Sequence, residues 1–311
     1  MIFLGFDTSN YTTSTASLEG SDSKNIRSIL PVKEGERGIR QSEGVFLHTK
    51  NLADLYKQLD IDFSRVRAVG ASTRPRNVEG SYMPVFLVGE NFAKGIAHSL
   101  GVPFFEFSHQ DGHIMAGIIS ENHEELLDSD FLSVHLSGGT TEILKSRFLG
   151  NGFSNTIIGA TKDISAGQFI DRTGVYLNMR FPCGKELEQL ALTAKNSIRL
   201  PVSVNGAYMH FAGVETKVKG MIDKEDHAVI ALSVLENVRD MLIKAINNAI
   251  EETGIKRVLI VGGVASNSII REGLIKKLNA DVFFGSSELS SDNAVGIAAL
   301  AKFSFNHNHG E

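Results

Sequence analysis

Two segments far apart in the chain repeat the same order of strand, polar turn and strand. An apolar run at residues 2–6 ends in the turn Asp7–Asn10, and a run rich in Thr, Ala and Ser follows at 12–18. A second apolar run, 132–136, ends in the turn Ser137–Thr141 and then resumes. Short alternating runs around Gly, Ser, Asn and Asp are typical of antiparallel hairpins. The repetition predicts two similar halves.

A third turn and several helices complete an alternating pattern. The apolar run 258–261 precedes the turn 262–267, which in turn precedes a helical stretch at 268–278. Apolar residues recur at helical spacing over 226–253, and a further helix is expected over 83–100. Strands that alternate with helices indicate an α/β protein.

Length and composition restrict the class of protein further. The 311 residues, 42% of them apolar, suffice for two domains, which we place at 1–125 and 126–311. A formal net charge of -5 argues against a globally basic nucleic-acid coat, so any RNA contact must be local. The single cysteine, Cys183, fits a reducing compartment. Because no apolar run approaches the roughly 20 residues that span a bilayer, we expect a cytoplasmic protein without a membrane segment.

The polar turns are candidate ligand sites. Ser137, Gly138, Gly139 and Thr140 offer amides and hydroxyls that can converge on a phosphate, although ordinary hairpin turns use the same residue types. In the first turn, Asp7 and Ser9 are candidate catalytic residues. Asp7 either orients a metal-bound water or a phosphate, or it caps its own turn.

A predicted helix over 163–178 carries a candidate ribose site. Gly167, Asp171 and Gly174 share one face of such a helix, and a carboxylate can accept hydrogen bonds from both ribose hydroxyls. Alternatively, the glycines serve close helix packing and Asp171 is solvated. The residues expected to complete the adenosine end of the site are Gly184, Glu188, Gly263 and Asn267.

His109 and His113 are four residues apart, so on a helix both imidazoles project from one face and can share a cation. Gln110 occupies the position of the general base of a His-Glu-x-x-His peptidase, which excludes that class. Asp292 is either a third metal ligand or the N-cap of an apolar helix at 294–301. Imidazole and carboxylate ligands suit zinc, iron or manganese.

Taken together, these segments resemble the Gcp/TsaD family of tRNA threonylcarbamoyladenosine transferases, formerly called O-sialoglycoprotein endopeptidases. The resemblance covers nearly the whole chain, with its motifs in order. They are Phe6–Ser9, Phe86–Gly89, Ala93–Ala97, His109–His113, Leu136–Thr140, Gly159–Asp163, Ala166–Asp171, Pro182–Gly184, Gly262–Asn267 and Ser291–Asn293.

The resemblance implies a two-lobed fold of the actin, Hsp70 and sugar-kinase (ASKHA) class, with a nucleotide and metal cleft between the lobes. It implies one divalent metal, Fe²⁺ or Zn²⁺ or else Mn²⁺ or Mg²⁺, and transfer of threonylcarbamoyl from threonylcarbamoyl-AMP to N6 of adenosine 37 in tRNAs that read ANN codons. Expected partners are tRNA and TsaB-like and TsaE-like accessory proteins, in a dimer or hetero-oligomer. The implied metal ligands are His109, His113 and Asp292, and the implied nucleotide contacts are Ser137, Gly138, Gly139, Asp171, Gly184, Glu188 and Asn267.

The chain also departs from the family pattern. Asn10–Thr13 stands where the family usually has Cys-Asp-Glu-Thr, and Arg74–Gly80 replaces a smaller glycine-rich loop. Glu215 stands where the family has lysine. These changes keep two alternatives open: a paralogue that carbamoylates or phosphorylates another acceptor, and a non-catalytic assembly subunit. The retained metal residues argue against the second alternative.

Overall fold

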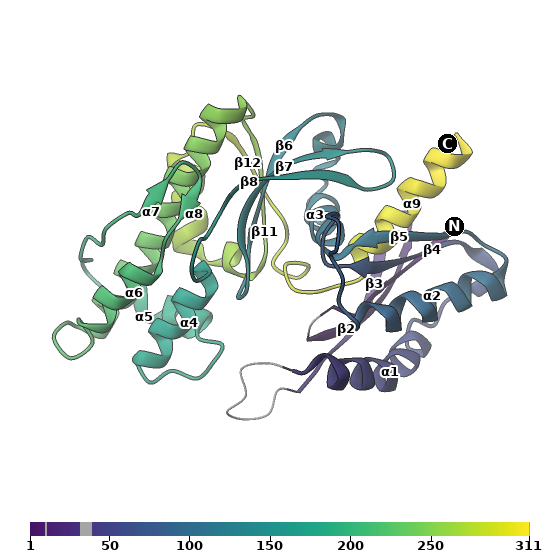
Figure 1. Ribbon diagram of the computed structural model, residues 1–311, viewed down its shortest axis with the longest axis horizontal. Coiled ribbons are helices and arrows are strands. Elements are labelled where there is room, and N and C mark those ends of the chain that lie inside the picture. Colours follow the sequence, from purple (N-terminus) through teal and green to yellow (C-terminus); the bar gives the residue numbers. More distant parts are fainter. Residues whose placement is uncertain (10, 32–38, 311) are drawn as a thin grey trace. The chain divides into compact units, whose positions relative to one another are not determined.

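The structure is a computed structural model that describes residues 1–9, 11–31 and 39–310 (Figure 1). Asn10, in the first predicted turn, lies outside the described residues. The chain forms two compact units, unit 1 with Met1–Asp128, Arg147–Ser154 and Ser291–Glu311, and unit 2 with Ser129–Ser146 and Asn155–Ser290. The chain first passes from unit 1 to unit 2 after Asp128, close to the expected division after residue 125. The division differs from the expected one at the C-terminus, which belongs to unit 1 because its helix packs on the first strand.

Unit 1 contains a five-stranded sheet in the order β3-β2-β1-β4-β5. Strand β1 pairs antiparallel with β2 and parallel with β4, so the first predicted hairpin is confirmed. Helices α1 and α2 pack on the sheet, as do α3 and α9 at its opposite face (Figure 1). The bounds are β1 Ile2–Asp7, β2 Thr12–Glu19, β3 Asp22–Ile29, β4 Val66–Arg74, β5 Phe104–Ser108, α1 Gln41–Lys57, α2 Phe86–Leu100, α3 His109–Ile119 and α9 Val295–His309, with short 3-10 turns at Phe63–Arg65 and Glu124–Asp128.

The two faces of β1 carry side chains of different size because successive residues alternate between faces. Phe6 packs against Tyr56 of α1 and Phe92 of α2, with ring centroids 5.6 Å away in both cases. On the other face, a Cβ on Gly5 would lie 2.2 Å from the Ala294 carbonyl oxygen. Only a glycine therefore allows the start of α9 to lie against β1.

Unit 2 repeats this plan with the order β12-β11-β6-β7-β8. Here β6 pairs antiparallel with β7 and parallel with β11, as β1 pairs with β2 and β4. The second predicted hairpin and the predicted repeat are thus confirmed. The bounds are β6 Phe131–Leu136, β7 Thr141–Phe148, β8 Phe153–Ala160, β9 Val204–Asn205, β10 Tyr208–Met209, β11 Arg257–Val261, β12 Asp281–Phe284, α4 Ala166–Tyr176, α5 Gly184–Ala191, α6 Ala212–Lys219, α7 His227–Thr253 and α8 Ser268–Lys277, with a 3-10 turn at Gly263–Ser266.

The predicted helices form, but two of them begin later than expected. Helix α4 begins at Ala166 rather than at 163, because Ser165 forms a capping box with Gln168. Asp163 instead accepts hydrogen bonds from the first amides of α6. Helix α2 begins at Phe86 rather than at 83, because tighter i to i+3 hydrogen bonds hold residues 83–88. No helix of the described ranges is long and apolar enough to cross a membrane.

Replacement of Gly296 by alanine tests the contact between α3 and α9. A Cβ at this position would lie 1.9 Å from the Gly112 carbonyl oxygen of α3, so the two helices must separate. We expect Gly296→Ala to lower the free energy of unfolding by about 1–3 kcal/mol, measured by denaturant titration. Gly95→Ala is the matched control, since nothing lies within 4 Å of its Cβ and helix propensity favours alanine. Equal stability of the two variants would contradict the contact.

Candidate functional site

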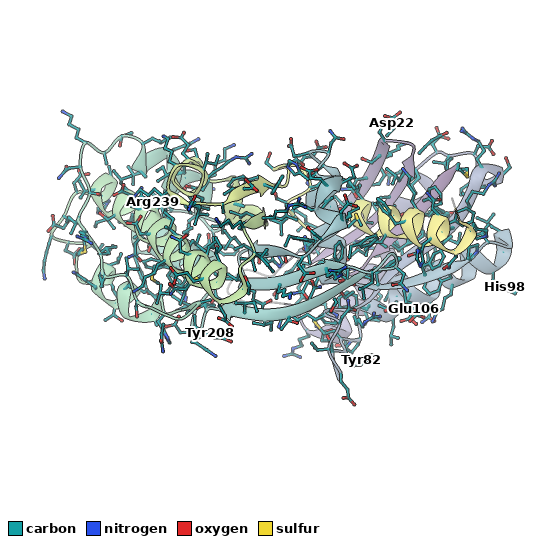
Figure 2. The ribbon with its side chains drawn as sticks, turned by 90° about the horizontal axis from the view of Figure 1, so that it is seen from above. Asp22, Tyr82, His98, Glu106, Tyr208 and Arg239 are labelled. Atoms are coloured by element: carbon teal, nitrogen blue, oxygen red, sulfur yellow. The ribbon has the colours of Figure 1, made fainter. Side chains whose placement is uncertain are left out.

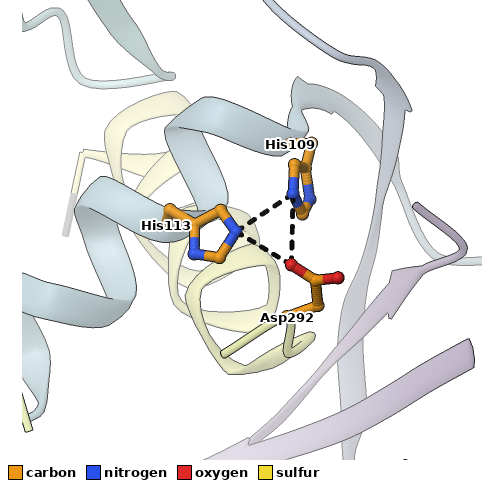
Figure 3. Close-up of side chains that lie close together, drawn as sticks. All are labelled: His109, His113 and Asp292. Carbon is orange, nitrogen blue, oxygen red and sulfur yellow. Dashed lines mark hydrogen bonds and ion pairs between the residues drawn. The ribbon is translucent and has the colours of Figure 1, made fainter. Parts of the chain in front are cut away.

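Two imidazoles and one carboxylate meet in unit 1 (Figure 3). The Nε2 atoms of His109 and His113 are 3.0 Å apart. Asp292 Oδ1 lies 3.6 Å from Nε2 of His109 and 3.3 Å from Nε2 of His113. The structure therefore brings together the three residues that the sequence proposed as metal ligands.

The start of α3 places both histidines. Strand β5 ends at Ser108, whose hydroxyl accepts from the Asp111 amide while the Asp111 side chain reaches back to the Ser108 amide. This capping box makes His109 the first helical residue, and His113 follows one turn later on the same face.

Asp292 is not the N-cap of α9, so the alternative reading of that residue is wrong. Its neighbour Asn293 caps the helix instead, because Asn293 Oδ1 accepts from the amides of Val295 and Gly296. The carboxylate of Asp292 is therefore available to face α3.

Asp7 caps its own turn, which is one of the two roles that the sequence left open, and it also contacts His109. Its Oδ1 accepts from the Ser9 amide at 2.8 Å, which closes the turn. Its Oδ2 lies 2.7 Å from Nδ1 of His109, which fixes that ring and directs Nε2 toward the other two residues. Asp7 is thus a positioning residue behind His109, an arrangement that is common behind metal-bound imidazoles.

The buried charges stabilise one another. Burial opposes the charged form of His109, but the carboxylates of Asp7 and Asp292 outweigh it and raise the pKa of His109 to about 9. Burial alone would raise the pKa of both carboxyl groups. The imidazole of His109 overcomes this for Asp7, and a hydrogen bond from His113 does so for Asp292, so both carboxyl pKa values fall below their usual range. The site therefore favours a cation among its carboxylates.

The donor atoms fit a divalent metal. An ion bound at about 2.1 Å holds its ligands about 3.0 Å apart in octahedral and about 3.4 Å apart in tetrahedral geometry. The separations of 3.0, 3.3 and 3.6 Å agree with these values to within a few tenths of an ångström. Two imidazoles and a carboxylate form a donor set suited to zinc, iron or manganese.

Ser9 lies in the same turn as Asp7, and its side chain is buried. Among the residues that the structure describes, its hydroxyl has no hydrogen-bond partner. A buried hydroxyl without a partner costs free energy unless a ligand or water satisfies it. Ser9 therefore remains a candidate ligand contact.

A network that the sequence did not reveal supports α3. Asn77 Nδ2 donates to Asp111 Oδ2 at 2.6 Å and to the Phe153 carbonyl oxygen at 3.2 Å. Arg74 donates to the Asn77 side-chain oxygen. The backbone N–H of Gln110 donates to the Pro75 carbonyl oxygen. The 74–80 loop is thereby attached to the first turn of the helix that carries both histidines. No local sequence signal indicates this network, because its members are far apart in the chain.

In unit 2, the 137–140 turn is closed by its own hydrogen bonds. The Thr140 amide donates to Ser137 Oγ, the Ser137 amide donates to the Thr140 carbonyl, and Ser165 Oγ donates to the Gly138 carbonyl. Within the described ranges, no group accepts from the amides of Gly138 and Gly139. Both glycines are exposed, so these amides are available to an anion.

The glycines of unit 2 fall into two groups. A Cβ on Gly167, Gly174 or Gly262 would lie 2.2–2.4 Å from a neighbouring atom, so close packing explains these three. A Cβ on Gly138, Gly139 or Gly263 would meet nothing within 4 Å, and none of these has a positive φ. Packing within the fold therefore does not require glycine at the second set. A ligand that approaches the backbone closely would explain why glycine stands there.

The remaining candidate nucleotide residues lie at two helix starts. Asp171 Oδ1 accepts from the Cys183 amide, directly before Gly184, the first residue of α5. Burial raises the pKa of Asp171, although this hydrogen bond opposes the shift. Asn267 Oδ1 caps α8. Glu188 Oε1 accepts from the amide and hydroxyl of Ser268, so Glu188 and Asn267 meet at the same helix start.

Solved structures define the class to which this fold belongs. The (R)-2-hydroxyglutaryl-CoA dehydratase component A of Acidaminococcus fermentans matches 99% of each chain with a TM-score of 0.59 at 16% identity. Full-length HypF covers 98% of this chain and 46% of its own, with a TM-score of 0.62 at 16% identity. A ROK-family glucokinase from Streptomyces griseus has a TM-score of 0.53 at 12% identity, over 97% and 99% of the chains. The protein therefore has the expected α/β fold of the actin and sugar-kinase class.

Within this class, the chain belongs to the tRNA N6-adenosine threonylcarbamoyltransferase (TsaD) family, whose model matches residues 47–299. A family member from Thermus thermophilus is 34% identical over 235 residues, which cover 74% of this chain and 69% of the relative. Another, from Thermotoga neapolitana, is 30% identical over 315 residues, covering 96% and 92%. The resemblance found in the sequence is confirmed, and the family is one of transferases.

Replacement of Asp7 by asparagine tests its support of His109. The amide keeps the size of the side chain but removes the negative charge that holds the ring. We expect Asp7→Asn to weaken binding of Zn²⁺ or Fe²⁺ about 10- to 100-fold, measured by competition with a chelator. Asp22→Asn, at the exposed start of β3 (Figure 2), should leave the affinity unchanged. Unaltered affinity of Asp7→Asn would show that Asp7 does not support a metal ligand.

A second substitution tests the open glycines. Gly139→Val should leave stability within about 0.5 kcal/mol, because its side chain has space and no strained backbone. If the Gly139 amide binds a phosphate, the new side chain should lower the affinity for AMP about tenfold or more, measured by calorimetry. Gly213→Val, an equally open glycine in α6, is the matched control. Equal AMP affinity in both variants would exclude the turn from the nucleotide site.

Proposed function

We propose that this protein transfers the threonylcarbamoyl group of threonylcarbamoyl-AMP to N6 of adenosine 37 in tRNAs that read ANN codons, with one divalent metal. The observation that carries the proposal is the His109, His113 and Asp292 cluster, whose donor atoms lie at metal-ligand separations. Membership of the family supports the reaction.

His109, His113 and Asp292 would hold the metal, with zinc or iron favoured by the two imidazoles and manganese or magnesium as alternatives. When bound, the metal supplies Lewis-acid polarisation and positioning of the acyl group. By its contact with Nδ1, Asp7 would keep Nε2 of His109 directed at the other two proposed ligands. Ser9 supplies a hydroxyl that lacks a described protein partner and that we assign to the acyl group.

The reaction needs no strong base. The N6 amine of adenosine attacks the carbamoyl carbon, the bond from that carbon to the phosphate oxygen breaks, and AMP leaves with the electron pair. The amine loses one proton as the new C–N bond forms, and solvent or the departing phosphate accepts it. Asp7 is not suited to that step, since it is buried and already accepts from the Ser9 amide and the His109 ring.

We assign the nucleotide part of the donor to unit 2. The amides of Gly138 and Gly139 and the hydroxyls of Ser137 and Thr140 are the proposed phosphate contacts, and the open Gly263 supports a backbone approach nearby. The proposed adenosine contacts are Asp171, Gly184, Glu188, Gly263 and Asn267.

The proposed partners follow from the reaction. Because the acceptor would be tRNA, we propose a cytoplasmic location, and the net charge of -5 suggests that other proteins help to hold the RNA. We propose TsaB-like and TsaE-like proteins for this role, in a hetero-oligomer.

A second candidate function is transfer of a carbamoyl or phosphoryl group to another acceptor. The observation that favours it is the charged 74–80 loop, which is attached to the first turn of α3 through Asn77 and Pro75. Tyr11 and Thr12 also stand where the family usually has acidic residues. Changes next to the metal residues can alter the acceptor while the metal and nucleotide sites are kept.

A transfer assay separates the candidates. Purified protein with Zn²⁺ or Fe²⁺, threonylcarbamoyl-AMP, unmodified tRNA and accessory proteins should give threonylcarbamoyladenosine, detected by mass spectrometry of the digested tRNA. His109→Ala with His113→Ala should reduce the rate at least about 100-fold, because the proposed metal loses two of its three protein ligands. His98→Ala with His123→Ala, changes at histidines outside the cluster, is the control. Metal and AMP binding without product on any tRNA would support the second candidate.

A further inference from the structure

Arg27 lies in one row with Asp7 across the sheet of unit 1. Asp7 of β1 is the register partner of Ser14 on β2, and Ser14 is the partner of Arg27 on β3. Directly paired residues of antiparallel strands project from the same face of a sheet. Arg27 therefore projects from the face that carries Asp7 and, through it, His109.

A direct contact ties Arg27 to the segment that carries Asp292. Its Nη1 donates to Oγ of Ser291, the residue immediately before Asp292. This contact places the guanidinium next to the residue that precedes one of the three proposed metal ligands.

The charge of Arg27 is available to a ligand. Its side chain is exposed, and within the described ranges it donates to Ser291 and no carboxylate pairs with it. A guanidinium has five N–H donors in a planar fork, so most of them remain for another group. In the first turn, Tyr11 and Thr12 bring no carboxylate that competes for it.

An anionic part of the donor substrate is the group that this geometry selects. Threonylcarbamoyl-AMP carries a phosphate and the α-carboxylate of its threonine. The phosphate already has candidate contacts in the amides of Gly138 and Gly139. Only Cα and the carbamoyl nitrogen separate the α-carboxylate from the carbonyl carbon that the metal would polarise. A planar carboxylate also matches the two parallel donors of a guanidinium.

We propose that Arg27 binds the α-carboxylate of the amino acid on the carbamoyl group, and so selects donors made from an amino acid. This inference rests on the proposed function. The hydroxyl of Ser9, which has no partner among the described residues, is a further donor in the turn that Asp7 caps.

Binding of two unreactive donor analogues tests the inference. Both have a sulfamide in place of the phosphate; one carries L-threonine and the other carries 1-aminopropan-2-ol, which lacks only the carboxylate. By calorimetry with Zn²⁺ present, Arg27→Ala should bind the threonine analogue about 10- to 100-fold more weakly than the wild type does. It should bind the amino-alcohol analogue and AMP as the wild type does. Arg27→Lys should recover part of the loss, because it keeps the charge but not the fork.

Lys24→Ala is the matched control. Lys24 is a cation on the same strand, but it projects from the other face and donates to the Leu59 carbonyl oxygen. Its replacement should leave all three affinities unchanged, and thermal unfolding should show that every variant is folded.

The outcomes separate the inference from the proposed function. If the wild type binds the threonine analogue and Arg27→Ala binds it equally well, only the inference fails. If Arg27→Ala loses affinity for both analogues and for AMP, Arg27 contacts the phosphate and the carboxylate assignment is wrong. If the wild type binds neither analogue, the proposed donor is wrong and the inference falls with it.

Discussion

The close contact between α3 and α9 is the constraint on which the candidate metal site depends. A side chain on Gly296 would enter the backbone of α3 at Gly112, and one on Gly112 would lie 2.9 Å from the Ile297 side chain. Gly5 brings the start of α9 equally close to β1. Because Asp292 lies three residues before the first residue of α9, these three glycines bring its carboxylate to the imidazoles of α3.

Burial makes this arrangement costly without a positive charge. Asp7 and Asp292 are two carboxylates beside the same imidazole, and neither is fully solvated. In the protein alone, the two carboxylates favour the protonated form of His109, which is why the pKa of His109 is raised. A divalent ion held by His109, His113 and Asp292 would neutralise the same carboxylates, and its binding would release protons. The carboxylates thus favour a cation in either state.

Local pattern determined most of the elements but not the contacts of the site. Both hairpins and α7 followed from residue spacing, and the pair His109 and His113 followed from helical geometry. Asp292 and Asn293 are both short polar residues before a helix, so the sequence alone did not show that Asn293 is the cap. Asn77 and Arg27 were missed because their roles depend on loop docking and strand register. Likewise, only neighbouring atoms distinguish glycines that pack from glycines that are open.

Two residues that depart from the family pattern form specific contacts in the structure. Glu215 accepts from Tyr176 and Arg172 in unit 2, and Asn77 joins its loop to Asp111. Neither change touches the three candidate metal ligands. In the first turn, by contrast, the acidic pair is absent, and Arg27 of β3 donates to Ser291, the residue before Asp292. Without the two carboxylates, the first turn offers Arg27 fewer competing anions, which agrees with the proposed contact between its guanidinium and the carboxylate of the donor.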